Sequence, residues 1–136
     1  MIVGVGIDIF RVDRMRRELN RSDGFETYVF TADEVSSARR RPHPAHRLAS
    51  VFAAKEAVVK ALAGAETFGM LWRDIEVSGE ETSPRIELSG RALGAAASLN
   101  VDDIRVAFSN TETEAVAMAL AVSTSPPHTS NPGVSR

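Results

Sequence analysis

Cysteine is absent from this chain of 136 residues, and its absence excludes three kinds of chemistry. Without a thiol, the protein forms no disulfide, binds no metal through thiolates and uses no cysteine nucleophile. Aromatic residues are also scarce, with six phenylalanines, one tyrosine and one tryptophan. No apolar run reaches the roughly 18–20 residues that span a bilayer, and the first residues lack the basic region and cleavage site of a signal peptide. We therefore expect a cytoplasmic protein with no membrane partner.

The remaining composition is that of one globular domain, because 43% of the residues are hydrophobic and 25% are charged. A chain of this length can bury a sizeable core. We expect residues 1–123 to form the domain. Residues 124–136 contain little apolar surface to anchor them, and we expect them to form a disordered tail.

Charge is nearly balanced overall, at a net −2, but it is unevenly distributed. Residues 11–47 contain nine arginines against six acidic residues; the arginines are Arg11, Arg14, Arg16, Arg17, Arg21, Arg39, Arg40, Arg41 and Arg47. Such an excess can attract phosphates, nucleic acid or an acidic protein. A solvated helix face followed by a basic loop explains the same pattern, so charge alone leaves the partner open.

The first segment, residues 2–9, alternates as a strand does. One face carries only large apolar side chains: Val3, Val5, Ile7 and Ile9. The other face is nearly bare up to Asp8, because Gly4 and Gly6 leave space where side chains would stand. The strand therefore presents a carboxylate beside unfilled space.

Further helices and strands follow from periodicity and capping. Thr31 and Glu34 form a capping box that opens a helix. We predict helices over residues 11–20, 46–63 and 89–100, with Gly64 ending the longest of them. Four more strands are predicted at 74–79, 84–90, 104–109 and 114–122. The order β-α-α-α-β-β-α-β-β favours an α+β domain in which helices cover one side of a mainly antiparallel sheet.

The longest predicted helix contains the run VFAAKEAVVKAL, in which charged residues interrupt an apolar stripe. Lys55 falls near the centre of that stripe, and a buried lysine must extend to solvent, pair with an acid or meet an anion. Glu56 lies at the edge of the stripe beside Lys60, and an exposed ion pair four residues apart would explain those two. That pairing does not explain Lys55.

Asp8 and Glu56 together can hold a hard cation. Two carboxylates, with water and phosphate oxygens completing an octahedron, suit Mg²⁺. Lys55 and Lys60 would then meet the remaining phosphate charge, as a diphosphate substrate requires. The simpler alternative for Asp8 is a turn or helix-capping residue at the end of the strand. His43 and His46 have no metal-ligand spacing, and we expect both at the surface.

At this point the chain resembles a known family. The segments GIDIFRVDRM, FAAKEAVVKAL, LWRDIEV and VAFSN are similar, in order and spacing, to those of holo-acyl-carrier-protein synthases. These belong to the 4′-phosphopantetheinyl transferase superfamily. The resemblance covers residues 2 to about 122, and its most specific marks are the strand aspartate and the KEAxxKA helix.

The resemblance implies an enzyme that moves the phosphopantetheine arm of coenzyme A to a serine of an apo acyl carrier protein, releasing 3′,5′-ADP. It implies Asp8 and Glu56 as Mg²⁺ ligands and Glu56 and Lys60 as catalytic residues. The residues implied to contact coenzyme A are Lys55, Lys60, Ser109, Asn110 and Arg47. The carrier protein would dock on the first helix, through Arg11, Arg14, Arg17 and Arg21. The family's short members form trimers with active sites between subunits, so a homotrimer is expected.

Two positions depart from the family pattern. Family members commonly carry arginine where this chain has Val51, and histidine where it has Asn110. Asparagine still donates a hydrogen bond but carries no charge. The basic loop from Arg39 to Arg47 could compensate by reaching the 3′-phosphate of coenzyme A.

Two other classes of protein remain as alternatives. The departures at Val51 and Asn110 would suit a binding module that retains the fold and holds coenzyme A or a carrier protein but transfers little. The basic 11–47 region would suit a nucleic-acid-binding protein, although no recognisable motif or interleaved aromatic residues accompany it. Our expectation is an enzyme without a nucleic-acid partner.

Overall fold

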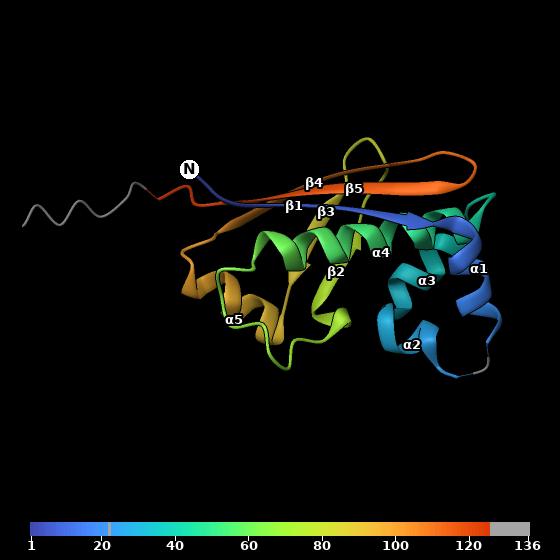
Figure 1. Cartoon of the computed structure of the whole chain (residues 1–136), viewed down its shortest axis with the longest axis horizontal. Coiled ribbons are helices and arrows are strands. Elements are labelled where there is room, and N and C mark those ends of the chain that lie inside the picture. The colour runs from blue at the N-terminus through green and yellow to red at the C-terminus, as the bar shows by residue number, and fades with distance from the viewer. Residues whose placement is uncertain (22, 126–136) are drawn as a thin grey trace, which may run out of the picture.

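The computed structural model describes residues 1–21 and 23–125. Its elements, in chain order, are β1 (Ile2–Arg11), α1 (Val12–Asn20), α2 (Phe25–Val29), α3 (Ala32–Arg39), α4 (Pro44–Ala61), the 3₁₀ turn η1 (Trp72–Asp74), β2 (Ile75–Ser78), β3 (Arg85–Leu88), α5 (Gly90–Ser98), β4 (Asp103–Asn110) and β5 (Glu114–Val122). The helices lie on one side of an antiparallel sheet (Figure 1). The predicted α+β class and order of elements are confirmed, with the short helix α2 added.

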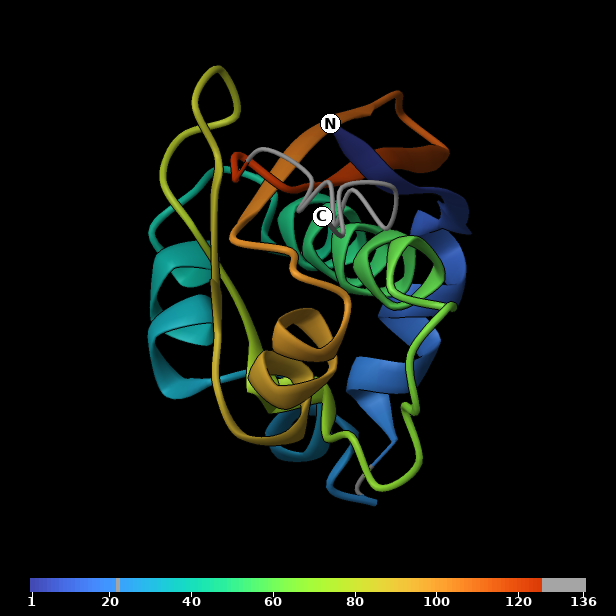
Figure 2. The same ribbon diagram turned by 90° about the vertical axis from the view of Figure 1, so that its left-hand side faces the viewer.

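The strands form two sheets. The larger has the order β1-β5-β4, with antiparallel pairing throughout, and the smaller is the hairpin β2-β3. Helix α4 runs along the inner face of the larger sheet, and Figure 2 shows it nearly end-on beneath the strands. Because α4 also contacts α1, α3 and β2, it is buried on most of its circumference and forms the centre of the domain.

The inner face of the larger sheet is made of very small residues. Strand β5 presents a row of buried alanines to α4: Ala115, Ala117, Ala119 and Ala121. Strand β1 presents Gly4 and Gly6, whose Cβ positions would fall 1.9 Å and 1.8 Å from carbonyl oxygens of α4. The space expected beside Asp8 is therefore filled by the helix backbone.

The large apolar side chains of β1 consequently face away from the core. Val5, Ile7 and Ile9 are 56–62% exposed, and their neighbours Val116 and Met118 on β5 are also exposed. All lie on the outer face of the sheet, which no other element of the described chain covers (Figure 1). We call this surface the outer sheet face.

The ends of α4 differ from the prediction. The helix starts at Pro44, two residues before the predicted His46, because proline at the first position has a preset φ and needs no hydrogen-bond partner for nitrogen. It ends at Ala61, with Leu62 as the cap. Gly64 is not in the left-handed conformation and does not act as the predicted C-cap. The capping box of Thr31 and Glu34 is confirmed.

The predicted domain boundary falls within the described chain. Thr124 donates from its backbone to the carboxylate of Asp102, so ordered contacts continue one residue past position 123. The rest of the predicted tail, from residue 126 on, lies outside the described residues. No helix in the described part of the chain has the length and apolar character to cross a membrane.

The contact between β1 and α4 can be tested at Gly6. In Gly6→Ala the new methyl group would overlap the Ala57 carbonyl oxygen, so strand and helix would have to separate. We expect the free energy of unfolding, measured by urea denaturation, to fall by about 3 kcal/mol.

Gly94→Ala in α5 is the matched control, because its added Cβ meets no atom within 4 Å. There, alanine should raise the free energy of unfolding by about 0.5–1 kcal/mol, as it generally does in a helix. A Gly6→Ala protein as stable as the wild type would contradict the described packing.

Candidate active site

Three of the predicted residues meet where β1 approaches α4. Asp8 Oδ1 lies 3.1 Å from Lys60 Nζ, and Lys60 also donates to the carbonyl oxygen of Ile7 at 3.0 Å. Lys60 thus pairs with Asp8 across the strand–helix contact. The alternative pairing with Glu56, suggested by spacing along the helix, is not the one formed.

Glu56 lies beside this pair and is electrostatically coupled to it. Partial burial raises the pKa of Glu56, and the negative charge of Asp8 raises that pKa further. The positive charges of Lys60 and Arg14 act in the opposite direction. A carboxylate whose charge is destabilised by a neighbouring carboxylate would be stabilised by a bound cation.

The donor set suits a magnesium ion. Carboxylate oxygens are hard ligands, and Mg²⁺ is usually held by one or two carboxylates while waters and substrate phosphates complete its octahedron. Within residues 1–21 and 23–125 there is no cluster of three or more acidic or histidine side chains that could enclose a metal. Asp8 and Glu56 would therefore leave several coordination positions for other oxygens.

Lys55 does not lie at this site, contrary to the prediction that it contacts coenzyme A. Its side chain is 0% exposed and its ammonium group lies 2.7 Å from Glu34 Oε1. It also donates to the carbonyl oxygens of Val29 and Trp72, at 2.8 Å and 3.1 Å. All three of its hydrogens have acceptors, so no donor is left for a ligand.

Glu34 is the counterpart of Lys55 and is equally buried. Its Oε1 also accepts from the backbone nitrogen of Thr31, and its Oε2 accepts from that of Val77. Burial lowers the pKa of Lys55, and the carboxylate of Glu34 partly offsets this. A buried pair is stable only with such complete hydrogen bonding. This pair joins α3, α4 and β2, and holds the residue before Glu56 in place.

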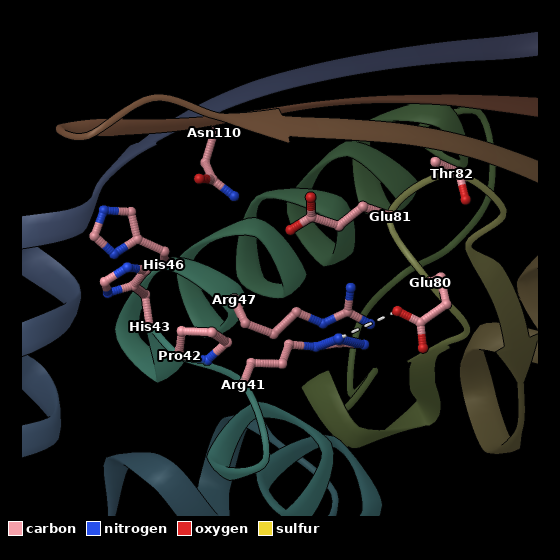
Figure 3. Close-up of a pocket in the computed structure, with 9 residues that line it drawn as sticks. All are labelled: Arg41, Pro42, His43, His46, Arg47, Glu80, Glu81, Thr82 and Asn110. Atoms are coloured by element: carbon pink, nitrogen blue, oxygen red, sulfur yellow. Dashed lines mark ion pairs between the residues drawn. The ribbon is translucent and has the colours of Figure 1, made fainter.

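A second group of residues surrounds a cavity of about 490 Å³ near the start of α4. Its lining consists of Arg41, Pro42, His43, His46, Arg47, Glu80, Glu81, Thr82 and Asn110 (Figure 3). Arg47, which is 2% exposed, lies beside Arg41, and Asn110 points into the cavity from β4 (Figure 3). We call this the arginine cavity. Two of the residues predicted to contact coenzyme A, Arg47 and Asn110, share it.

Ser109 is separated from its neighbour in sequence. It lies on the outer sheet face, in a shallow depression beside Val116 and Met118, whereas the side chain of Asn110 donates to Ser50 on the inner side. Successive residues of a strand point to opposite faces. Within one chain, the structure therefore does not bring Ser109 and Asn110 together.

His46 is not the free surface residue that the sequence suggested. It is half-buried, and its Nε2 lies 3.0 Å from the carbonyl oxygen of Glu112 in the turn between β4 and β5. Its ring is 5.4 Å from that of His43, and both line the arginine cavity. Neither its pairing with a turn 66 residues away nor the cavity is visible in local sequence.

The four predicted docking arginines are all exposed, on α1 or at its two ends. Arg11 and Arg17 lie near Asp13, and Arg21 lies near Glu18, in exposed ion pairs. The guanidinium of Arg14 instead lies over the ring of Phe10, 5.2 Å from its centre. Of the four, Arg14 is the one whose charge acts on the pKa of Glu56, which it lowers.

This combination of an antiparallel sheet, a central helix and paired carboxylates agrees with the family comparison. A family model described as the 4′-phosphopantetheinyl transferase superfamily matches residues 4–121, and the chain belongs to this superfamily of transferases. A holo-[acyl-carrier-protein] synthase from Alkaliphilus metalliredigens is 42% identical over 123 residues, which are 89% of this chain and 99% of that relative.

Solved structures show the same fold. The holo-ACP synthase of Plasmodium yoelii superposes with a TM-score of 0.78 at 26% identity, covering 92% of this chain and 98% of that one. The enzyme from Bacillus anthracis, solved in complex with CoA (3′,5′-ADP), has a TM-score of 0.72 at 28% identity, covering 91% and 99%. The family expected from the sequence is thereby confirmed.

Proposed function

We propose that this protein is a Mg²⁺-dependent holo-acyl-carrier-protein synthase. It transfers the phosphopantetheine arm of coenzyme A to a serine of an apo acyl carrier protein and releases 3′,5′-ADP. The observation that carries the proposal is the convergence of Asp8, Glu56 and Lys60 at the contact between β1 and α4. The names of the curated relatives, and the CoA complex of the Bacillus anthracis enzyme, support the choice of substrate.

The residues have separate roles in this reaction. Asp8 and Glu56 hold the metal, which when bound neutralises charge on the diphosphate of coenzyme A. Lys60 is 52% exposed, so its ammonium group can donate to the phosphate that is transferred. Glu56 accepts the proton of the carrier serine, directly or through a water.

The bonds exchanged at phosphorus balance. The serine oxygen bonds to the phosphorus that carries pantetheine, and the bond from that phosphorus to the bridging oxygen breaks. The bridging oxygen leaves with 3′,5′-ADP. Lys60, together with a cation held by Asp8 and Glu56, would offset the negative charge on that leaving group. The serine proton moves to Glu56, and no further reactant is needed.

The transfer can be observed directly by mass spectrometry of an apo acyl carrier protein incubated with the protein, coenzyme A and Mg²⁺. We expect one phosphopantetheine arm to be added. Asp8→Asn and Glu56→Gln should each slow transfer by at least about 100-fold. Glu87→Gln, which changes an exposed carboxylate on β3, is the matched control and should transfer at the wild-type rate.

Two results would count against the proposal. Full activity in a folded Asp8→Asn or Glu56→Gln protein would remove these residues from the mechanism. Absence of transfer by the wild type, with carrier binding intact, would favour the binding-module alternative. That alternative has an observation in its support, because Val51 is buried in the core and Asn110 carries no charge.

The carrier protein docks on α1 in this proposal. Arg11, Arg14, Arg17 and Arg21 present exposed guanidinium groups, and their exposed ion pairs are weak enough for an acidic partner to replace. Because α1 follows β1 directly and packs against α4, a partner bound to α1 would lie next to the strand–helix contact that holds the carboxylates.

Reversing charges on α1 should weaken carrier binding selectively. For the double variant Arg14→Glu/Arg17→Glu we expect the KM for the carrier protein to rise at least about tenfold, and to depend less on salt. The KM for coenzyme A should change little. Arg39→Glu/Arg40→Glu, an equal charge change at the end of α3, is the control. An unchanged KM for the carrier protein in the double variant would rule out α1 as the docking surface.

The outer sheet face supports the homotrimer that the resemblance implies. Monomeric proteins seldom leave so many adjacent large apolar residues exposed, so this face suits association with other copies of the chain. Asp8 lies on one edge strand of the sheet and Asn110 on the other, with β5 between them. Association would let the Asp8 edge of one copy and the arginine cavity of the next serve one coenzyme A molecule.

Light scattering of the purified protein should give the mass of three chains. Met118→Glu places a charge in the middle of the outer sheet face and should yield single chains. Leu93→Glu, at an exposed apolar residue of α5, should remain trimeric. A wild-type protein that is monomeric at micromolar concentration would contradict the proposed assembly.

A further inference from the structure

The arginine cavity contains buried donors without acceptors. Arg47 donates through Nη2 to the carbonyl oxygen of Gly79 at 2.9 Å, but its Nε and Nη1 have no partner in the described chain, and neither has Nε of Arg41. The guanidinium of Arg47 lies 5.1 Å from the centre of the Phe108 ring. A buried donor without an acceptor destabilises the folded protein, and more so when it is charged. The cavity is therefore incomplete without an acceptor.

Arg47 lies one helical turn before Val51 in α4. Val51 faces the core and is 1% exposed, so it contributes nothing to the cavity. The other arginines of the basic loop are directed elsewhere. Arg39 pairs with Glu26 at 2.9 Å and Arg40 donates to Ser36, both around a separate depression. Only Arg41 and Arg47, of the loop predicted to reach a phosphate, face this cavity.

The turn between β2 and β3 places two carboxylates at the same cavity. Glu80 Oε2 lies 3.6 Å from Nη1 of Arg41, and Glu81 reaches toward the space between Arg47 and Asn110 (Figure 3). Both arginines also donate to the carbonyl oxygen of Gly79, at the start of this turn. Burial and the charge of Arg41 lower the pKa of Arg47, while Glu81 and Glu80 oppose that effect.

Glu80 holds Arg41 only weakly, because its side chain is 78% exposed, its distance to Arg41 is long, and such surface pairs contribute little to stability. Glu81 forms no ion pair with either arginine among the described residues, and acts on Arg47 only through its charge. A phosphate monoester carries nearly two charges and can accept two parallel hydrogen bonds from one guanidinium, which is a shorter and stronger interaction. A phosphate can therefore displace the carboxylates. Their negative charge repels the phosphate and weakens its binding.

We propose that Glu80 and Glu81 are displaceable counter-ions of a phosphate monoester site formed by Arg41 and Arg47. In the free protein they neutralise the two arginines, and a terminal phosphate such as the 3′-phosphate of coenzyme A replaces them. The acidic turn therefore lowers the affinity for phosphate. This inference rests on the proposed function for the choice of ligand, although the site itself follows from the cavity.

The test is calorimetric titration of the full chain with 3′,5′-ADP. We expect Glu80→Gln/Glu81→Gln to bind about 3- to 10-fold more tightly than the wild type, because the competing charges are gone. Arg47→Gln should bind at least about tenfold more weakly. Glu87→Gln on the same hairpin and Arg39→Gln in the same basic loop are controls, and should match the wild type. Adenosine, which has no phosphate, should not distinguish the glutamine variants from the wild type.

Unchanged or weaker binding of 3′,5′-ADP by Glu80→Gln/Glu81→Gln would overturn the inference, as would absence of binding by every form. The binding titration and the transfer assay can give different results, and so test the two proposals separately. Tighter binding by the glutamine variants without any modification of a carrier protein would refute the transferase proposal and support this one. Transfer at the wild-type rate with unchanged 3′,5′-ADP affinity in the same variants would overturn this inference alone.

Discussion

The approach of β1 to the backbone of α4 is the constraint on which the rest of the structure depends. Gly4 and Gly6 let the strand lie directly on the helix, and no residue with a Cβ would permit the same distance. The contact sets Asp8 opposite Glu56 and brings Lys60 to the carbonyl oxygen of Ile7. The same contact turns the large apolar residues of β1 outward, so that the position of the carboxylates and the outer sheet face have one cause.

Different faces of α4 direct Lys55, Glu56 and Arg47 to different parts of the domain. Lys55 points into the domain and is held by Glu34 together with carbonyl oxygens of two other segments, which fixes the rotation of the helix about its axis. Glu56 is thereby directed toward β1, and Arg47 toward β4 and the β2–β3 turn. Because a buried pair of this kind is strongly destabilising to break, the helix cannot rotate to exchange these faces. Within one chain, the carboxylates and the arginine cavity therefore lie on different faces of α4 in a fixed relation.

Much of this arrangement was predictable, because it is encoded locally. Alternation identified the strands, and the capping box of Thr31 and Glu34 was recognised three residues apart. The second role of Glu34 was not visible, since its contacts with Lys55 and Val77 join segments 21 and 43 residues away. Helix α2 was missed because its five residues are too short to show a period of 3.6. The role assigned to Lys55 was wrong for the same reason, because its partner is distant in sequence.

The sequence by itself determined the class of the fold and the family, and it placed Asp8 near the end of a strand and Glu56 and Lys60 on one helix. These depend on periodicity, on residue types and on motif spacing, all of which are properties of the chain. Only the tertiary structure decided which face of β1 meets the core, which charge neutralises Lys55, and which arginines of the basic loop share a cavity with Glu80 and Glu81. Alternation defines two faces of a strand but not which one is buried, and a charge has no partner until folding brings distant segments together.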